Sequence, residues 1–424
     1  MRVLLVGGGG REHALAWKLA QSPALTQLVA APGNPGIARL AKTVPIDVKD
    51  TAGLVRLAQA ERVDLVVVGP EAPLAAGLIE ELARRGIAGF GPTSGAAAVE
   101  SSKSFAKGLM KRAGVPTAPY REFTEFSEAQ DYLAWCPMPV VIKADGLAAG
   151  KGVFVCTSRD EALHWTRLLL VEHMLGTAGK RLLVEDYLPG KELSILAITD
   201  GHKLLPLLAA QDHKRLQDGD MGPNTGGMGG YAPVPFAKPA LMRSLCEEIL
   251  QPTINVLAKL GCPYRGLLYA GLMVTDSGPK VLEFNCRFGD PETQVILPLI
   301  DGDLLPVLAA AARGDLGGLS LSWREGSALC VVLTAEGYPH APRRGDVIHG
   351  LQEAEAVEGV TVFHAGTAVH NGRTVTDGGR VLAVTAYGQD LPSARAAAYR
   401  AAECIQFPGR YYRRDIGRQG LNQV

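Results

Sequence analysis

The first hundred residues alternate short apolar runs with stretches of helical spacing. Apolar residues recur at three- and four-residue intervals over 11–22 and 74–86, as in amphipathic helices that cover a sheet. Four short apolar runs surround these helices: VLLV, QLVAAP, DLVVVGP and IAGFGP. Strands alternating with helices in this way predict a parallel sheet with helices on both faces. Because ligands bind beyond the carboxyl ends of such strands, the loops GGGGREH, APGN and GPEAPL are expected to border one site.

The pattern beyond residue 101 predicts further parts of the chain. A basic amphipathic helix ends at Gly114, and a small lobe follows that reads as strand, loop, strand, helix and strand. A larger lobe has strands around one helix near 241–260, and the last part has three strands and a terminal helix. The expected division is 1–101, 102–118 (linking helix), 119–191, 192–325 and 326–424.

A long polar segment, QDHKRLQDGDMGPNTGGMGGY, covers residues 211–231. Loops of this length without structure are uncommon and are either functional or disordered. The segment mixes charged side chains with glycines, so a functional loop and a disordered linker both remain open.

The stretch VLEFNCR at 281–287 begins like a buried strand but carries polar residues at every second position. In an extended chain Glu283, Asn285 and Arg287 share one face, and Leu282, Phe284 and Cys286 share an apolar, core-facing one. A carboxylate and an amide oxygen are ligands that Mg²⁺ prefers, together with substrate phosphates. Arg287 is expected to reach a phosphate oxygen. The alternative is a charged edge strand whose polar residues face solvent.

Composition narrows the class of protein. The 424 residues carry 43 basic and 43 acidic side chains, which argues against a nucleic-acid partner held mainly by charge. Seven cysteines without a CxxC pair favour reduced thiols in a cytosol over a disulfide framework. The N-terminus reads as a first strand and not as a signal peptide, and no apolar run is long enough for a membrane span.

Two glycine-rich stretches suggest phosphate sites. GGGGREH fails the G-x-G-x-x-G spacing of dinucleotide-binding domains, but its amides open a helix and could bind a phosphate or phosphosugar. The alternative is a tight turn that packs helix on strand. DGLAAGKG at 145–152 differs from a P-loop in its spacing and joins two strands. It is either a mobile lid over phosphates, with Lys143 at the end of the incoming strand and Lys151 in the loop, or a flexible hairpin with a solvated lysine.

The ordered set of motifs resembles glycinamide ribonucleotide synthetases, the phosphoribosylamine–glycine ligases of the ATP-grasp superfamily, over essentially the whole chain. The most specific motifs are EFNCRFGDPETQ and GPNTGGMG, and the others include APGNPG, VVGPEAPL, VIKADGLAAGKGV, QDHKR and VFHAGT. The resemblance implies an α/β fold: an N-terminal doubly wound, phosphosugar-binding domain, a two-lobed ATP-grasp domain with a small mobile lid lobe, and a C-terminal mixed β/α domain.

The resemblance also implies an activity. ATP, glycine and 5-phosphoribosylamine would give glycinamide ribonucleotide, ADP and phosphate through a glycyl phosphate, a step of de novo purine biosynthesis. The expected cofactor is Mg²⁺ or Mn²⁺, with ATP as co-substrate. The expected partners are small molecules, without nucleic acid or membrane, and we expect a cytoplasmic monomer.

Site residues follow from the same resemblance. The metal ligands are Glu283 and Asn285. The catalytic residues are Arg287, Asp212 and Lys214. The nucleotide is expected at Lys103, Lys143, Gly150, Lys151, Glu185, Tyr187, Leu188 and Glu192. The other substrates are expected at Gly9, Gly10, Asn34, Gly69, Pro70, Glu71, Asp290 and Pro291.

The sequence departs from the ATP-grasp pattern in two places, and rival functions remain. The strand before EFN has no acid until Asp276, which leaves the ligands of a second ion open, and VEHMLGTAGKR is a short connection. The rivals are another ATP-grasp carboxylate–amine ligase, a biotin-dependent carboxylase component and a phosphosugar-binding regulator without turnover. A nicotinamide dehydrogenase fits least.

Overall fold

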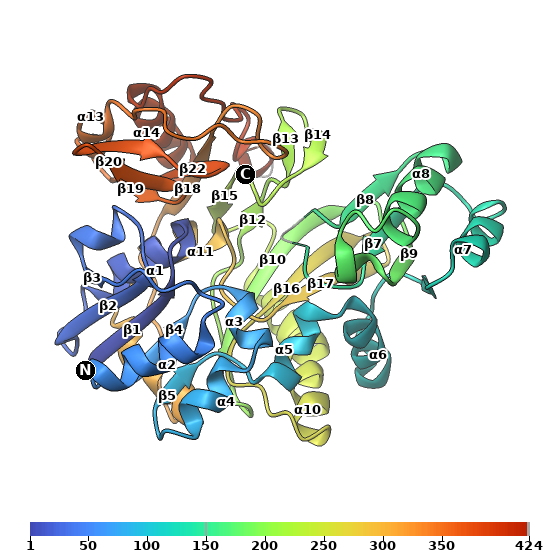
Figure 1. The fold of residues 1–424 in the computed structure, drawn as a ribbon, viewed down its shortest axis with the longest axis horizontal. Coiled ribbons are helices and arrows are strands. Elements are labelled where there is room, and N and C mark those ends of the chain that lie inside the picture. The colour runs from blue at the N-terminus through green and yellow to red at the C-terminus, as the bar shows by residue number, and fades with distance from the viewer. Residues whose placement is uncertain (149–150, 422–424) are drawn as a thin grey trace.

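The computed structural model describes residues 1–148 and 151–421. Figure 1 shows an N-terminal region at the left, a C-terminal region above it, a central antiparallel sheet in the middle and a small lobe at the right. Within the described residues, no helix combines the length and the apolarity needed to span a bilayer.

The N-terminal sheet is parallel, with the order β3-β2-β1-β4-β5. Leu4 and Val6 belong to one apolar cluster and Val3 and Leu5 to another, so both faces of the sheet are covered. The prediction of a doubly wound sheet is therefore confirmed. Its elements are β1 (Arg2–Gly7), α1 (Gly10–Leu19), β2 (Gln27–Pro32), η1 (Ile37–Arg39), β3 (Lys42–Thr43), α2 (Thr51–Ala60), β4 (Leu65–Val68), α3 (Glu71–Ala75), α4 (Leu78–Ala83), β5 (Ala88–Phe90) and α5 (Ser94–Ser101).

The small lobe has its own apolar cluster, which includes Ile142, Leu169 and Val184. Its antiparallel sheet has the order β6-β9-β7-β8. The predicted strand, loop, strand, helix and strand are present, and the structure adds a strand and a helix before them. The elements are β6 (Tyr120–Phe123), α7 (Phe126–Leu133), β7 (Val140–Ala144), β8 (Val153–Cys156), α8 (Arg159–Leu170), η2 (Gly176–Gly179) and β9 (Leu182–Asp186).

The central sheet is antiparallel, with the order β11-β10-β16-β17. The basic helix before the small lobe, Lys103–Ala113, packs against the helix Gln251–Lys259. It ends at Gly114, which has a φ of 69°. The elements are α6 (Lys103–Ala113), β10 (Lys191–Thr199), β11 (Leu204–Pro206), α9 (Pro239–Leu245), the π-turn η3 (Cys246–Leu250), α10 (Gln251–Lys259), β16 (Gly266–Thr275), β17 (Gly278–Asn285), α11 (Glu292–Ile296), η4 (Leu297–Leu299) and α12 (Leu304–Arg313).

The C-terminal sheet recruits part of the polar segment 211–231. Its order is β12-β15-β18-β22-β19, and a separate hairpin, β13-β14, connects its first two strands. The disordered-linker interpretation of this segment is therefore wrong. The elements are β12 (Gln211–Asp212), β13 (Arg215–Gln217), β14 (Met221–Asn224), β15 (Gly229–Ala232), β18 (Ser327–Thr334), α13 (Leu351–Glu355), β19 (Val360–His364), β20 (Thr367–His370), β21 (Arg373–Thr376), β22 (Arg380–Gly388), α14 (Leu391–Cys404) and α15 (Arg418–Leu421).

Candidate active site

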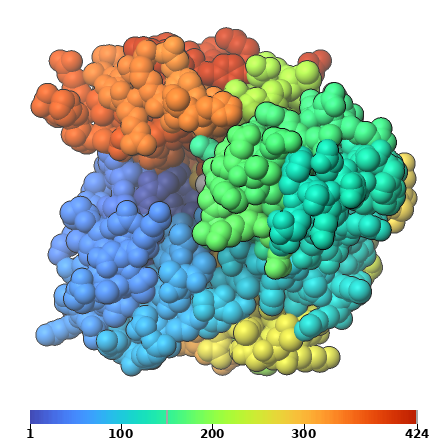
Figure 2. Space-filling model, turned by 45° about the vertical axis from the view of Figure 1, so that its right-hand side comes forward, coloured from blue at the N-terminus to red at the C-terminus, as the bar shows by residue number. Residues whose placement is uncertain are grey.

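A cavity of about 1010 Å³ lies where all four regions meet. In Figure 2 a groove separates the blue N-terminal region from the green small lobe, below the orange C-terminal region. Side chains from α6, β7, the end of β9, β17 and the 211–226 segment line the cavity, and Arg380 of β22 joins them. Of the three loops predicted to border one site, GGGGREH contributes Arg11 and GPEAPL contributes Pro70 and Glu71, whereas no residue of APGN lines the cavity.

Glu283 and Asn285 lie on β17 and line this cavity, as their alternation predicted. They face Gly271 and Tyr269 of β16, so this neighbouring strand adds no carboxylate beside them. A register shift leaves Leu282 without a partner in β16. As a result Val281, and not Leu282, joins Phe284 and Cys286 in the apolar core, and the prediction that Leu282 shares their buried face is wrong.

One end of the cavity, which we call the lysine end, consists of Lys103, Lys107, Lys143 and Glu185. Nζ of Lys107 and Nζ of Lys143 each lie 3.0 Å from Oε2 of Glu185. The Lys143 ammonium also donates to the Leu282 carbonyl at 2.9 Å. Burial lowers the pKa of Lys107 to about 8 although Glu185 opposes it, and burial also lowers the pKa of Lys103. Two of these cations, Lys107 and Lys143, therefore share one buried carboxylate, and the Lys103 ammonium donates to the Gly146 carbonyl at 3.4 Å.

Glu185 retains an unused acceptor. It is buried, and among the described residues its Oε1 has no hydrogen-bond partner. A buried acceptor without a partner is energetically unfavourable unless a ligand or water supplies a donor. The end of β9 therefore offers a site for a polar ligand atom that donates a hydrogen bond.

Lys214 stands among carboxylates in the middle of the cavity. Its Nζ lies 3.4 Å from Oε2 of Glu192 and 3.9 Å from Oε1 of Glu283. Burial opposes the charge of Lys214, but Glu192, Asp212 and Glu283 raise its pKa well above the usual value. Burial, reinforced by Glu292 and Glu192, raises the pKa of Asp212 against the effect of Lys214.

Glu283 itself remains an anion in this setting. Burial acts to raise its pKa, but Lys214, Lys143 and Lys103 together hold the pKa below its ordinary value. A carboxylate kept ionised beside an amide oxygen on the same face can ligate a cation. The charged-edge-strand alternative does not describe this geometry, because the pair lines a cavity.

The other end of the cavity contains three arginines, and we call it the arginine end. It consists of Arg11, Arg287, Arg380, Glu71 and Asp290. Nη2 of Arg287 lies 2.8 Å from Oε1 of Glu100, and Nε lies 3.3 Å from Oε2 of Glu71. Nη2 of Arg287 also donates to Oδ1 of Asn285 at 3.1 Å. These contacts orient the Asn285 amide. They also pair the Arg287 guanidinium, which was expected to reach a phosphate oxygen, with carboxylates of the protein.

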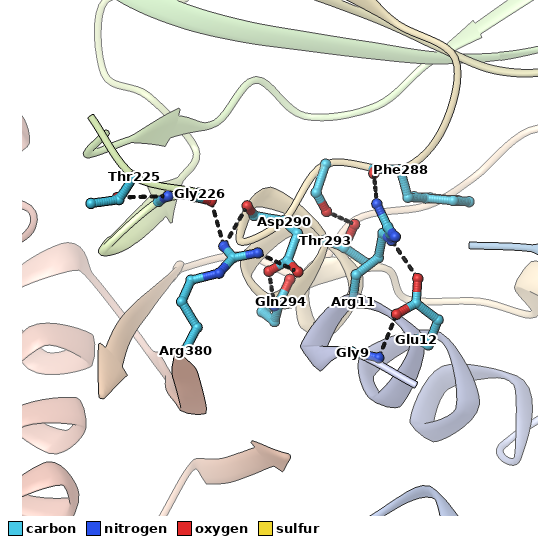
Figure 3. A network of polar contacts seen from close by, with 12 residues as sticks. Gly9, Arg11, Glu12, Thr225, Gly226, Phe288, Asp290, Thr293, Gln294 and Arg380 are labelled. Carbon is cyan, nitrogen blue, oxygen red and sulfur yellow. Dashed lines mark hydrogen bonds and ion pairs between the residues drawn. The ribbon is translucent and has the colours of Figure 1, made fainter. Parts of the chain in front are cut away.

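The 288–294 segment lies between the N-terminal and C-terminal regions (Figure 3). Arg11 donates to the Phe288 carbonyl at 3.2 Å, and its Nε lies 2.5 Å from Oε1 of Glu12. The other carboxylate oxygen of Glu12 accepts the Gly9 amide at 2.7 Å. Part of the amide cradle in the GGGGREH loop is thus occupied by the protein's own carboxylate.

Sequence profiles of one family match nearly the whole chain. The profile described as "Phosphoribosylglycinamide synthetase, N domain" matches residues 1–100, its ATP-grasp (A) domain profile matches 101–293, and its C domain profile matches 328–419. The chain belongs to the phosphoribosylglycinamide synthetase family. The resemblance found in the sequence, including its ATP-grasp assignment, is therefore confirmed.

Members of the phosphoribosylglycinamide synthetase family resemble the chain over their full length. The phosphoribosylamine–glycine ligase of Synechocystis sp. is 51% identical over 425 residues, which cover 99% of this chain and 100% of that protein. That of Mesorhizobium japonicum is 49% identical over 424 residues, which cover 99% of both.

Solved structures agree with this assignment. The crystal structure of the Thermotoga maritima phosphoribosylamine–glycine ligase is 35% identical with a TM-score of 0.85, covering 98% of this chain and 100% of that one. The biotin carboxylase domain of Hydrogenobacter thermophilus 2-oxoglutarate carboxylase has a TM-score of 0.75 at 18% identity, covering 97% of this chain and 91% of that one. At that identity the likeness shows a shared fold alone.

The structure brings most of the predicted site residues to the cavity wall. They are Lys103, Lys143, Glu185, Tyr187, Leu188, Glu192, Asp212, Lys214, Glu283, Asn285, Arg287, Pro70, Glu71 and Asp290. Among the described residues, the wall does not include Lys151, Gly9, Gly10, Asn34, Gly69 or Pro291. Gly150 lies outside the described residues.

Asn34 is engaged by the backbone around it. Its amide donates to the carbonyls of Gly8 at 2.9 Å and His364 at 2.8 Å, and its Oδ1 accepts the Ile37 amide at 2.9 Å. In this structure Asn34 therefore supports the loop after β1 and does not line the cavity.

Sequence reasoning missed several residues of the cavity wall. Lys107 could have been found, because it follows Lys103 by four residues and so shares its helix face. Glu292 belongs to the motif EFNCRFGDPETQ but was not assigned to the site, and it accepts hydrogen bonds from Tyr269 and Ser194 at 2.8 and 3.1 Å. Glu100 and Arg380 carry no local signal, because their partners are distant in the chain.

Proposed function

We propose that this chain joins glycine to 5-phosphoribosylamine in an ATP-dependent ligase reaction of de novo purine biosynthesis. The products are glycinamide ribonucleotide, ADP and phosphate. The observation that carries the proposal is the placement of Glu283 and Asn285 on one face of β17, in a cavity whose walls also hold Lys103, Lys143 and Lys214. Family membership and relatives named phosphoribosylamine–glycine ligase support the choice of substrates.

The donors on β17 fit a hard divalent cation. They are a carboxylate and an amide carbonyl, and the described part of the chain has no group of three or more His, Cys, Asp or Glu side chains placed to hold a metal ion. Mg²⁺ typically binds through one or two carboxylates together with substrate phosphates. We therefore assign Glu283 and Asn285 to Mg²⁺, or Mn²⁺, held jointly with ATP. When bound, the ion neutralises charge that develops on the phosphates.

The lysine end suits the nucleotide. Oε1 of Glu185 lacks a partner among the described residues and would accept a hydrogen bond from the exocyclic amine of adenine. The neighbouring backbone at Tyr187 and Leu188 would complete the adenine site, and Glu192 would bind the ribose hydroxyls. Lys103 and Lys143 would face the phosphates, where fixed positive charge stabilises phosphoryl transfer. Lys151, in the connection between β7 and β8, would add positive charge near them.

The chemistry requires little beyond orientation and charge. A carboxylate oxygen of glycine attacks the γ-phosphorus, and the bond from that phosphorus to the bridging oxygen breaks to release ADP. The amine then attacks the carbonyl carbon of glycyl phosphate. A C–N bond forms, the C–O bond to phosphate breaks, and the amine loses a proton. We propose that Asp212, Lys214 and Arg287 orient glycine and the amine, and that the hairpin β7-β8 excludes water from glycyl phosphate.

The phosphosugar would bind beyond the carboxyl ends of β1 and β4. These strands are neighbours, and the order of the sheet reverses between them, where ligands of such sheets bind. Gly9, Gly10, Gly69 and Pro70 would provide the backbone of this site and Glu71 a carboxylate. Asn34 would maintain the loop, and the 290–291 corner, Asp290 and Pro291, would close it.

We propose a cytoplasmic monomer that acts on small molecules and not on nucleic acid or membranes, with the phosphosugar-binding region at 1–101, a linking helix at 102–118, a lid lobe at 119–191, a catalytic lobe at 192–325 and a C-terminal domain at 326–424.

Substrate omission tests the function. We expect phosphate release only when ATP, glycine, 5-phosphoribosylamine and a divalent ion are present together. The phosphosugar amine can be formed in the assay from ribose 5-phosphate and ammonia. Phosphate release with bicarbonate in place of glycine would indicate a carboxylase, and release with aspartate would indicate a different ligase.

A further inference from the structure

Arg380 at the start of β22 bridges two segments that both line the cavity (Figure 3). Its Nη1 donates to the carbonyl oxygen of Asp290 at 2.9 Å and to the carbonyl oxygen of Gly226. Its Nη2 donates to Oδ2 of Asp290 at 2.9 Å. One guanidinium from the C-terminal sheet therefore contacts two connecting segments. One follows β14 and contains Gly226 and Gly227, and the other follows β17 and contains 288–291.

The two bridged links are tightly packed. A Cβ on Gly226 would lie 3.0 Å from Cζ of Arg380, and a Cβ on Gly227 would lie 2.5 Å from Cδ of Pro291. The amide of Gly226 donates to the hydroxyl of Tyr338 at 3.0 Å. Both backbone polar groups of Gly226 are thus held by side chains of the C-terminal region.

Asp290 has both carboxylate oxygens engaged by protein donors. Oδ2 accepts from Arg380, and Oδ1 accepts from Nε2 of Gln294 at 2.7 Å. Arg11 holds the same segment from the N-terminal side through the Phe288 carbonyl at 3.2 Å. Since the carboxylate is committed to Arg380 and Gln294, it fixes the position of the 288–291 link relative to Gly226.

None of these contacts involves the lysine end. Lys103, Lys107 and Lys143 contact Glu185, Gly146, Leu282 and the link after α6. A change at Arg380 should therefore alter one end of the cavity while the other keeps its contacts. This separation allows a positioning role to be distinguished from a general loss of structure.

We propose that Arg380 is a positioning residue for the amine substrate. By fixing Asp290 against Gly226, it sets the geometry of the arginine end, where 5-phosphoribosylamine must meet glycyl phosphate. The C-terminal sheet thereby acts on the reaction through Arg380. This inference rests on the proposed function.

The test compares Arg380→Met and Arg380→Lys with the wild-type protein. Arg373→Met is the matched control, because Arg373 is exposed on β21 of the same region. We expect Arg380→Met to raise the KM for 5-phosphoribosylamine at least tenfold and to raise the ATP consumed per glycinamide ribonucleotide, because a misplaced amine leaves glycyl phosphate to water. The KM for ATP should stay within twofold. Both values for Arg380→Lys should lie between those of Arg380→Met and wild type, since lysine retains the charge but has one nitrogen in place of Nη1 and Nη2. Arg373→Met should match wild type.

The outcomes separate the two proposals. If the wild-type protein forms no amide product, the proposed function fails. If the wild-type protein is active and Arg380→Met lowers the melting temperature without changing either the KM for the amine or the ATP-to-product ratio, the positioning role is contradicted. If Arg380→Met does not fold, the KM for the amine and the ATP-to-product ratio are measured for Arg380→Lys. Values equal to those of wild type overturn the proposal.

Discussion

Each end of the cavity has three cationic side chains, but the two sets differ in how far carboxylates neutralise them. At the lysine end, Lys107 and Lys143 share one carboxylate, Glu185, and one oxygen of Glu185 has no partner among the described residues. At the arginine end, each guanidinium already has a carboxylate: Arg11 has Glu12, Arg287 has Glu71 and Glu100, and Arg380 has Asp290.

The difference separates charge that is available to a ligand from charge that maintains structure. A polyphosphate needs cations that are not neutralised, and the flexible, compact ammonium of lysine suits that use. The planar guanidinium forms several directed hydrogen bonds and holds carbonyls and carboxylates in fixed positions. We therefore expect lysine substitutions to affect nucleotide use and arginine substitutions to affect stability and the placement of the other substrates.

The largest effect is expected between the two ends, at Glu283. Glu283→Gln keeps the volume of the side chain but removes the charge that would hold the cation. Because metal stabilisation of a transition state is worth several kcal/mol, turnover should fall roughly 10³-fold. Steady-state kinetics measures turnover and calorimetry measures the melting temperature, which should change little. Asp276→Asn, on the exposed turn of the same hairpin, is the control. Normal turnover with a large loss of stability would contradict the metal role.

Arg287→Met tests whether the arginine end maintains structure. It would leave Glu100 and Glu71 without their main cation, and removing one partner of a buried ion pair typically costs about 3 kcal/mol or more. We expect that loss in the free energy of unfolding measured with urea, together with reduced activity. Arg343→Met, which breaks an exposed pair, should cost about 1 kcal/mol or less. Equal losses in the two variants would remove the distinction between the ends.

Lys143→Met tests the opposite expectation for the lysine end. Removing a fixed cation near the transferred phosphoryl should lower kcat/KM for ATP about 10²-fold. Stability should change less than in Arg287→Met, because Lys107 still pairs with Glu185. Lys180→Met, exposed in the small lobe, serves as the control. The comparison fails if Lys143→Met unfolds the protein while the kinetics of its folded fraction stay normal.

The smallest effect per residue concerns the stability of the protein in acid and arises at His13 and His364. Burial lowers the pKa of His13 to about 3, and His364 and Arg39 add to this shift. Burial also lowers the pKa of His364 to about 4. Nδ1 of His13 accepts the His364 amide at 2.7 Å. Because unfolded histidine binds a proton near pH 6.5 and these folded histidines do not, stability is complete above that pH and falls as pH decreases toward 4.

Between pH 7 and pH 5 each of these histidines should contribute a loss of about 2 kcal/mol in the free energy of unfolding. His364→Asn keeps an atom that can bond Thr367 and should make the dependence on pH shallower when urea unfolding is repeated at each pH. His340→Asn, at an exposed position, should leave it unchanged. An unaltered slope in His364→Asn would contradict this account of the contact between α1 and β19.

The sequence predicted what depends on local periodicity and missed what depends on pairing across the chain. The two-residue alternation placed Glu283 and Asn285 on one face, and the strand–helix alternation gave the N-terminal sheet. The position of Leu282 depends on a shift in register against β16, which no local pattern records. Likewise, the segment 211–231 is ordered because β15 pairs with β18, about a hundred residues later.

The same distinction between local and long-range signals explains which residues of the candidate site could be predicted. Residues in recognisable motifs, such as Lys143 and Glu71, could be singled out from the sequence, and both line the cavity. Glu100 and Arg380 lie in ordinary helical and strand sequence, and only the fold brings them to Arg287 and Asp290. Asn34 illustrates the reverse case, because a residue in a conspicuous glycine loop supports the backbone and does not line the cavity.

The most direct test of the central claim is a crystal structure with ADP and Mn²⁺, in which anomalous scattering locates the metal. The account predicts one Mn²⁺ in contact with Glu283 and Asn285, the diphosphate beside Lys103 and Lys143, and adenine next to Glu185. Nucleotide bound at the arginine end, or manganese bound without either β17 ligand, would contradict it.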